Sequence, residues 1–389
     1  MQEKTLGLIV APGYVEAIIK ELVEDLPKQL KRFVNSDITW KIECHVDSWT
    51  GGTNYAERAI EWTRFEMENK DWDYAITLTD LPLFDDRKPI TAEVHSDKKI
   101  AFISLPGFGF TPMKKRVRES IIQMMDEIYF GSSDQERRES EVKQDQEEDN
   151  EVKYQGPKNL VGKRFFEVIS PLRREVLHEK DSSVHARYTL GSDTAGLIKI
   201  ISGMVNANRP FKLFQAFLKI VIIAFTTGTY ALVFPTIWGL STNYSVGRSI
   251  LLMLAAIITL VVWIIISNNL WEKKTGEEQP HIRRLYNVTT VLTLLITVIM
   301  YYVLLFVMFL TIILLLIPPS QVAQNLSVDS VGLGPYLYTV WIGTSLSTFI
   351  GALGTAFNNE KILLNSTYGY RQQQRRKTTE EIEEEAEDD

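Results

Sequence analysis

Long apolar runs fill the second half of the chain, whereas short stretches of apolar and polar residues alternate in the first half. Four runs are long enough to cross a hydrocarbon core of roughly 30 Å at about 1.5 Å per helical residue. They cover Phe217–Leu240, Ser249–Ile266, Leu285–Ile317 and Tyr336–Ala356. The pattern predicts four transmembrane helices within residues 211–357. No Gly or Pro interrupts the third run before Pro318, which favours one long tilted helix.

Basic residues between the runs predict the topology. The second connection carries Lys273, Lys274, Arg283 and Arg284, whereas the first has only Arg248 and the third has no basic residue. The segments before the first run and after the last run are also basic. By the positive-inside rule, the second connection and both termini are expected in the cytoplasm.

The first half of the chain has the pattern of an α/β domain, which we place at residues 1–130. Strands are expected at Leu6–Val10, Trp40–Val46, Tyr74–Leu78, Ile90–Val94 and Ile100–Leu105, the last two as a hairpin. Apolar residues at helical spacing follow Gly13, Gly52 and Pro112. Alternating strands and helices predict a mainly parallel sheet with an antiparallel hairpin.

Three further segments have distinct compositions. Residues 131–159 are rich in charge and poor in large apolar residues, which predicts a flexible linker. Residues 160–210 form a basic juxtamembrane segment, with a strand expected at Val184–Leu190 and a helix at Thr194–Val205. Residues 358–389 form a tail with an acidic end. Because the linker offers little to pack against, residues 1–130 are expected to fold independently.

Net charge and cysteine content restrict the function less than the hydrophobic pattern does. The formal net charge of −7 comes largely from acidic residues in the linker and in the tail. Cys44 is the single cysteine, so the chain has no internal disulfide and no cysteine-rich metal site. We expect it to be a small buried hydrophobic residue. The apolar run Leu6–Val10 is too brief to be the core of a secretory signal, which predicts that the α/β domain stays in the cytoplasm.

Glycine-containing loops suggest one candidate binding site. Gly13, the pair Gly51 and Gly52, and the pair Gly107 and Gly109 each lie between an expected strand and an expected helix. With Thr79 and Asp80, they would line the carboxyl edge of a parallel sheet, where open α/β folds bind ligands. Amides at helix starts would favour an anionic ligand. The alternative is that these glycines serve tight turns alone.

Basic residues begin the helix that follows Pro112. Lys114, Lys115, Arg116 and Arg118 occupy its first turns, where the helix dipole favours negative charge. A phosphate group, an acidic segment of the same chain or a lipid headgroup would compensate them. The alternative is a basic face that water solvates.

The sequence contains no diagnostic catalytic or metal motif. It has no dinucleotide fingerprint, phosphate-binding loop, HExxH or GxSxG. We therefore expect no metal and no cofactor, and Asp80 is only a weak candidate for a catalytic residue.

The apolar runs contain few residues suited to transport. Their only charged residue is Lys219, which is close enough to the cytoplasmic end of the first run to reach the interface. Coupled carriers normally need charged residues within the membrane. In the last run, Gly343, Ser347, Gly351 and Thr355 recur every four residues. Such a stripe permits close helix packing, either within the bundle or between two copies of the chain.

Three segments of the first half carry a resemblance to a known family. The stretch Trp72–Pro82, the sequence Pro106–Gly109 and the basic run Lys114–Arg118 resemble an uncharacterised multi-pass membrane-protein family of Gram-positive bacteria. Its members are sometimes labelled 5,10-methylene-tetrahydrofolate dehydrogenase. The resemblance implies a bacterial plasma membrane. The label implies a dehydrogenase, for which the sequence shows neither a dinucleotide fingerprint nor a catalytic lysine.

The sequence favours a non-catalytic ligand-sensing, regulatory or scaffolding protein anchored in the membrane. Its expected partners are the bilayer and either a small anion or a cytoplasmic protein, with homo-oligomers possible and no nucleic acid. One alternative is a membrane-surface enzyme acting on an anionic small molecule at the glycine loops. Another is a channel or an uncoupled exporter.

Overall fold

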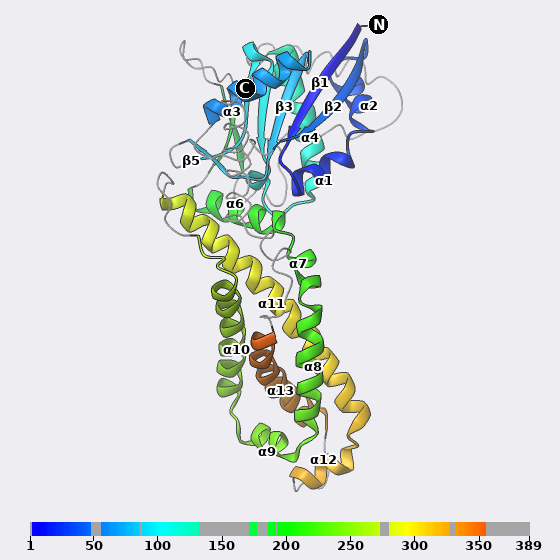
Figure 1. Cartoon of the computed structure of the whole chain (residues 1–389), viewed down its shortest axis with the longest axis vertical. Helices are drawn as coiled ribbons and strands as arrows, with labels where there is room; N and C mark the ends of the chain where they lie inside the picture. Colours follow the sequence, from blue (N-terminus) through cyan, green and yellow to red (C-terminus); the bar gives the residue numbers. More distant parts are fainter. Residues whose placement is uncertain are drawn as a thin grey trace, which may run out of the picture. The chain divides into compact units, whose positions relative to one another are not determined.

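The computed structural model describes residues 2–47, 56–85, 88–131, 171–176, 186–191, 193–272, 280–326 and 332–354. The chain divides into two compact units, one formed around Met1–Ala207 and the other around Asn208–Arg371. The first contains a sheet with helices, and the second is helical in its described part (Figure 1). The expected linker at 131–159, apart from Gly131, and the tail at 358–389 lie outside the described residues.

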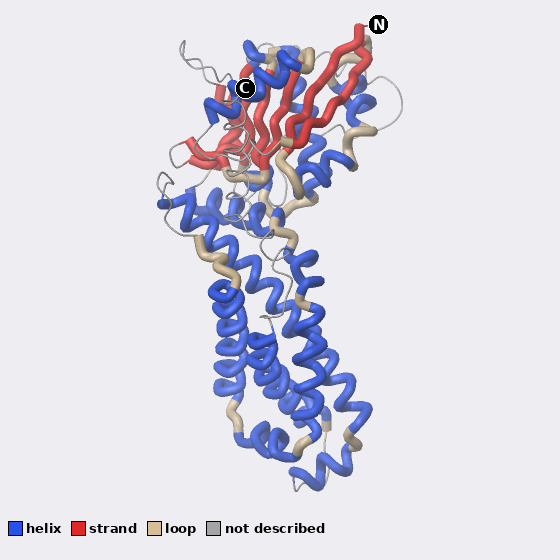
Figure 2. Tube along the Cα trace, in the orientation of Figure 1, coloured by secondary structure: helices blue, strands red, loops and turns tan. Residues whose placement is uncertain are grey.

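The first unit is built on one mixed sheet with the strand order β2-β1-β3-β6-β5-β8-β7 (Figure 2). Its parallel part consists of β1 (Gln2–Val10), β2 (Ile38–Val46), β3 (Tyr74–Thr79) and β6 (Ile100–Ser104). Its antiparallel part consists of β5 (Lys88–His95), β7 (Leu172–Val176) and β8 (Ala186–Leu190), with β4 (Leu83–Asp85) paired to β5. The expected mixed sheet and its β5–β6 hairpin are confirmed.

The sheet extends beyond residue 130, where we expected the domain to end. Strand β8 pairs with β5, and β7 pairs with β8, both antiparallel. The sheet is therefore about evenly parallel and antiparallel, and the expectation of a mainly parallel sheet is corrected. Within the expected juxtamembrane segment, the predicted strand and helix are present as β8 and α6 (Asp193–Ala207). Strand β7 was not predicted, because its Leu-Arg-Arg-Glu-Val sequence has no clear apolar alternation.

Helices cover both faces of the sheet. On one face lie α1 (Tyr14–Lys20), α2 (Leu26–Phe33) and α4 (Met113–Phe130), and on the other lies α3 (Ala56–Asn69). Thr63 of α3 bonds Thr77 at 2.9 Å, whereas Tyr129 of α4 contacts the ring of Tyr74. Because neighbouring strand residues point to opposite faces, β3 is sandwiched between the two layers. All six of its residues are accordingly buried.

Buried polar side chains join α4 to the added strands. Arg174 of β7 forms two bonds of 2.8 Å to the carboxylate of Glu127 on α4. Tyr188 of β8 donates to the same carboxylate at 2.6 Å and accepts from Gln123 at 2.8 Å. Burial lowers the pKa of Arg174, but the hydrogen bond and charge of Glu127 more than offset this and raise that pKa above its ordinary value. The strands are thus held by a satisfied polar network as well as by the sheet.

The second unit contains seven described helices. They are α7 (Pro210–Ala216), α8 (Leu218–Val233), α9 (Pro235–Asn243), α10 (Val246–Ser267), α11 (Pro280–Leu316), α12 (Pro319–Leu326) and α13 (Leu333–Gly354). Two of them, α10 and α11, are long and apolar enough to cross a membrane. The pair α7 and α8, bent by 55°, would add a third span if it acts as one. The third run is one continuous helix of 37 residues, as expected.

The first predicted span is broken rather than continuous. Helix α8 ends at Val233, and α9 begins at Pro235 after the extended residue Phe234. A proline disfavours helical geometry in the residue before it and lacks the amide that would continue the ladder. Pro235 therefore ends the helix that we expected to run to Leu240.

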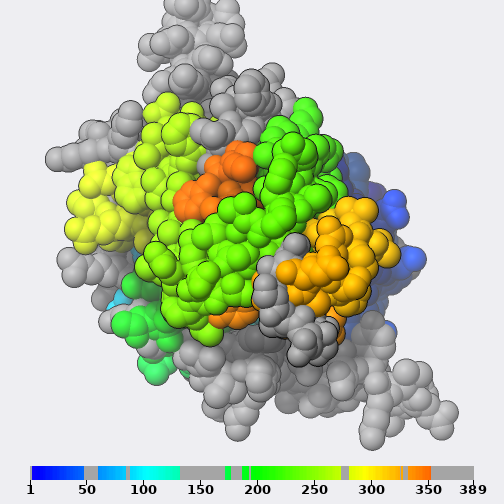
Figure 3. Space-filling view, turned by 90° about the horizontal axis from the view of Figure 1, so that it is seen from below, coloured from blue at the N-terminus to red at the C-terminus, as the bar shows by residue number. Residues whose placement is uncertain are grey.

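The fourth predicted run forms α13, which lies at the centre of the unit. It contacts α8, α9, α10 and α11, and the view in Figure 3 shows it between α8 and α10. Its hydroxyl residues Thr339, Thr344, Ser345 and Thr348 have no exposed surface. By contrast, α10 and α11 expose many large apolar side chains. The polar composition of α13 thus follows from its position inside a shell of apolar helices.

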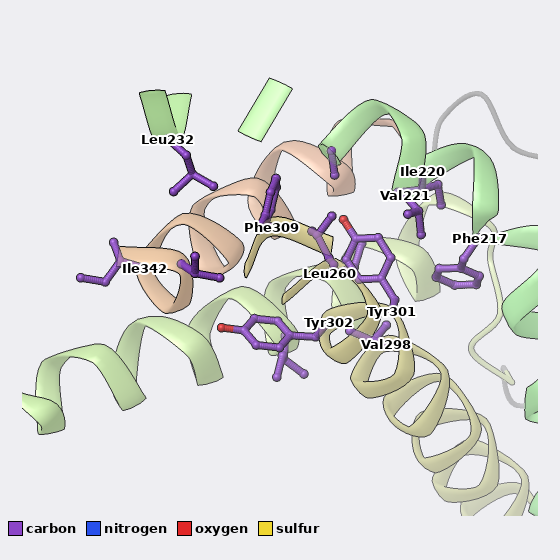
Figure 4. Close-up of a cluster of buried hydrophobic side chains, with 14 of the residues drawn as sticks. Phe217, Ile220, Val221, Leu232, Leu260, Val298, Tyr301, Tyr302, Phe309 and Ile342 are labelled. Atoms are coloured by element: carbon purple, nitrogen blue, oxygen red, sulfur yellow. The ribbon is translucent and has the colours of Figure 1, made fainter. Parts of the chain in front are cut away.

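Small residues allow this close packing. A Cβ added to Gly343 would lie 2.5 Å from Leu232 of α8, and one added to Gly351 would lie 2.5 Å from the hydroxyl of Tyr301 on α11. A Cβ at Gly228 of α8 would overlap Ser347. Figure 4 shows Tyr301, Phe309 and Leu232 within the surrounding buried cluster. The described members of the predicted stripe pack within the bundle, and Thr355 lies outside the described residues.

Adding residues 131–207 to the expected domain should stabilise it strongly. We expect residues 1–207 to unfold in one cooperative thermal transition. The free energy of unfolding of residues 1–130 should be lower by about 5 kcal/mol, because β5 lacks β8 on one side and the buried side chains of Tyr188 and Leu190 are absent. Differential scanning calorimetry of the two fragments measures this difference. Equal midpoints would show that β7, β8 and α6 contribute nothing to the stability of the domain.

Candidate functional site

The carboxyl edge of the parallel strands brings several predicted site residues together. Gly13 follows β1, Asp80 follows β3 and Gly107 follows β6, and these three strands are parallel neighbours. Strand β2, which follows β1 in the chain, lies on one side of β1, and β3, which follows α3, lies on the other side. The switch point of the sheet is therefore between β1 and β3, where open α/β sheets bind ligands. Gly51 and Gly52 lie outside the described residues.

The amide of Gly13 already has a partner within the protein. Gly13 has a φ of 92° and donates its N–H to the carboxylate of Glu16 at 3.2 Å. Glu16 also accepts from Lys20 at 2.6 Å. The bond from Lys20, followed by that from Gly13, lowers the pKa of Glu16. An internal carboxylate thus occupies the position that we expected an anionic ligand to take.

The end of β3 forms a closed turn. The hydroxyl of Thr79 accepts the N–H of Leu81 at 3.1 Å, and Ser104 donates to the carbonyl of Leu81 at 2.7 Å. Asp80 lies inside this turn with no exposed surface. Asp80 is at the carboxyl edge of the sheet, as predicted, but its carboxylate is buried and does not line an open cleft.

The loop after β6 is covered by α6. Gly107 lies against Thr91, and Gly109, with a φ of 70°, lies against Lys199 and Ser202 of α6. Ser202 accepts the N–H of Phe110 at 3.2 Å. The expectation that Gly107 and Gly109 form an open ligand loop is therefore corrected, because both are buried under other parts of the same unit.

Close approach of two backbones positions α6 over this loop. A Cβ added to Gly203 would overlap the carbonyl of Pro106. Gly196, two turns earlier on α6, lies against Leu190 of β8, where an added Cβ would be 3.2 Å from that side chain. The residues that close the edge were not predicted as part of the site. The seven-residue spacing of Gly196 and Gly203 is the one sequence signal that could have indicated this close-packed face.

Acidic side chains of the same unit compensate the basic start of α4. Lys114 pairs with Glu21 at 3.0 Å, and Arg118 approaches Asp25 at 3.7 Å. Arg116 is 3 % exposed and lies 4.0 Å from Glu119, with its guanidinium 5.5 Å from the centre of the Phe108 ring. Lys115 remains exposed, with no ion pair to another described residue. The cations that seemed misplaced in the sequence mostly stabilise contacts between α4 and its neighbours.

The rest of the unit offers little catalytic chemistry. Among the described residues, no cluster of His, Cys, Asp and Glu could hold a metal ion. Cys44 is exposed on the edge strand β2, so the expectation of a buried cysteine is wrong. Its neighbour His45 lies 3.6 Å from the buried carboxylate of Glu66, which is also 3.5 Å from the ammonium of Lys70.

A comparison of the chain with known protein families, curated proteins and solved structures finds no match. The contacts at the carboxyl edge therefore provide the basis for inferring a function.

Two glycines at this edge should respond differently to alanine. Both have positive φ, so each substitution carries strain of about 1–3 kcal/mol. Gly109→Ala should lower the free energy of unfolding by about 1–3 kcal/mol more than Gly13→Ala does. A Cβ added at position 109 would lie 2.8 Å from the side chain of Lys199, whereas a Cβ added at position 13 would have nothing within 4 Å. Thermal unfolding of the full chain measures both. Equal losses would argue against close contact between α6 and the loop.

Proposed function

We propose that the chain is a membrane-anchored regulatory or scaffolding protein whose α/β unit recognises a small anion or a partner protein. The observation that supports this is the position of α6 on the loop after β6. Helix α6 ends at Ala207, and the next residue, Asn208, begins the second unit. Any rearrangement at the carboxyl edge would move the segment that leads into the membrane part. A closed edge connected in this way suits a sensor better than an open catalytic cleft.

Catalysis is the less favoured alternative. The Gly13 amide, Lys114 and Arg118 are all engaged by carboxylates of the same unit. Asp80 would need exposure before it could act as a general base. The enzymatic interpretation therefore requires an opening of the turn after β3.

For the membrane part, we propose four spans with both termini in the cytoplasm of a bacterial cell. The charge distribution of the sequence supports this arrangement. Helix α13 would cross the bilayer while shielded by α8, α10 and α11, which explains why its hydroxyl side chains are buried. Helix α11, about 55 Å long at 1.5 Å per residue, would extend beyond the hydrocarbon core.

Thiol labelling tests this topology. In a Cys44→Ser background, Asn243→Cys and Gln324→Cys should react with an impermeant reagent on intact cells, and Lys274→Cys should react only after lysis. Asn243 and Gln324 are exposed, whereas Ser241, in the same connection, is buried and would be a poor probe. Labelling of Lys274→Cys alone on intact cells would contradict the proposed topology.

Hydrogen exchange of the full chain in lipid nanodiscs tests the proposed function. Nucleotides, inorganic phosphate and folates would serve as probes. A probe that raises the unfolding temperature should also slow amide exchange in α6, because α6 forms part of the closed edge. Gly203→Ala should raise basal exchange in α6 and abolish this response, whereas Gly239→Ala, with nothing within 4 Å of the added Cβ, should leave both unchanged.

Other outcomes separate the alternatives. Stabilisation without any change in α6 would contradict transmission through that helix. Turnover of a probe that disappears in a folded Asp80→Asn variant would favour the enzyme. No response to any probe would favour a scaffold that binds a protein, which affinity capture with residues 1–207 as bait would test once that fragment is shown to fold.

A further inference from the structure

We propose that the groove between α10 and α11 binds one acyl chain of an anionic phospholipid, with its headgroup beside Arg284. The groove has a volume of about 570 Å³ and an almost entirely apolar lining. This volume lies within the roughly 300–1,000 Å³ of ordinary ligand sites. The two helices that form it are the two long apolar helices able to cross a membrane.

The walls of the groove show that it opens toward lipid. Its outer wall is a row at helical spacing on α10, Ile258, Val262 and Ile266, which are 57 %, 45 % and 66 % exposed. Its floor includes Val261 and Ile265, which are buried. Side chains that are exposed on a membrane-spanning helix face hydrocarbon, so the natural occupant is an acyl chain.

One end of the groove is polar. Asn269 and Trp271, both exposed, follow the end of α10 and line this end. Glu272 follows Trp271, and its backbone is bonded by the side chain of Asn287 on α11. The Asn287 amide oxygen accepts the N–H of Glu272 at 2.8 Å, and its NH₂ group donates to the carbonyl of Glu272 at 3.3 Å. These bonds fix Trp271 beside the first turns of α11. Tryptophan prefers the membrane–water interface, which places this end at the level of the headgroups.

A cation lies on the same face of α11 as the groove. Val291 and Leu295 line the groove, and Arg284 precedes them by seven and eleven residues. Residues at these spacings lie within a narrow sector of a helix, and seven residues rise about 10 Å. Arg284 is exposed, and the first turn of α11 contains no acidic residue. Glu272, the described carboxylate next to Trp271, is 7 % exposed.

The positive charge of Arg284 therefore favours an anionic phospholipid as the occupant of the groove. An acyl chain in the groove would bring its phosphate to the level of Trp271 and Arg284, where a guanidinium can bind it with charge-assisted hydrogen bonds. A headgroup with net negative charge gains more from this cation than a zwitterionic headgroup, because the latter carries its own positive group. The expected preference is about fivefold, as for one basic side chain near an anionic surface.

Native mass spectrometry of the full chain tests the proposal. The chain would be released from bilayers that contain equal amounts of phosphatidylglycerol and phosphatidylcholine, and retained lipids would be counted. Wild type should retain one phosphatidylglycerol with about fivefold preference. Val291→Trp should lose the lipid by filling the groove, whereas Val303→Trp, at an exposed site of the same helix outside the groove, should keep it.

Two arginine variants separate the headgroup from the acyl chain. Arg284→Gln should retain a lipid but lose the preference for phosphatidylglycerol, whereas Arg248→Gln, before α10 enters its apolar stretch, should keep that preference. Arg284 is exposed, so its variant tests the proposal even if Val291→Trp fails to fold. The proposal is overturned if wild type shows no preference, if the preference survives Arg284→Gln, or if a folded Val291→Trp retains the lipid as wild type does.

Discussion

The close approach of Gly203 to the carbonyl of Pro106 is the contact on which the first unit depends. Helix α6 can lie on the loop after β6 only because position 203 carries no side chain. From there, α6 contacts Gly109 and bonds the backbone of Phe110 through Ser202. One glycine thus lets a helix from the far end of the unit close the edge where a simpler α/β domain would bind a ligand.

Glycines also allow close packing in the second unit, whose apolar helices are suited to a lipid environment. Gly228, Gly343 and Gly351 bring α8, α11 and α13 so close that an added methyl group would overlap a neighbour. In lipid, apolar burial gives helices little reason to associate, so packing and hydrogen bonds have to hold them. Tyr302 of α11 bonds Ser345 of α13 at 2.8 Å, which adds a polar contact to this packing. A central helix rich in hydroxyl and small residues is therefore compatible with an apolar exterior.

Most of the charged groups that suggested an anion site form hydrogen bonds or ion pairs with side chains of the first unit itself. Glu16 caps the turn at Gly13, and Glu21 and Asp25 meet the basic start of α4. These residues lie far apart from α4 in the sequence and become neighbours only because α1, α2 and α4 share one face of the sheet. The same positions that suggested an anion site in the sequence thus stabilise the layer of helices. This favours a unit that senses or binds through rearrangement over one with a preformed catalytic cleft.

The sequence by itself determined the elements that depend on neighbouring residues. Period-two alternation located β2, helical spacing located α4 and α6, and the unbroken apolar run located α11 as one helix. It also placed Gly13 and Asp80 after strands that were expected to be parallel. Only the tertiary structure decided that β8 joins β5, where Arg187 and Glu93 meet although 94 residues separate them, and that α6 covers Gly109. The physical reason is that periodicity reports which face of an element is buried, whereas the partner on that face is selected by contacts between distant segments.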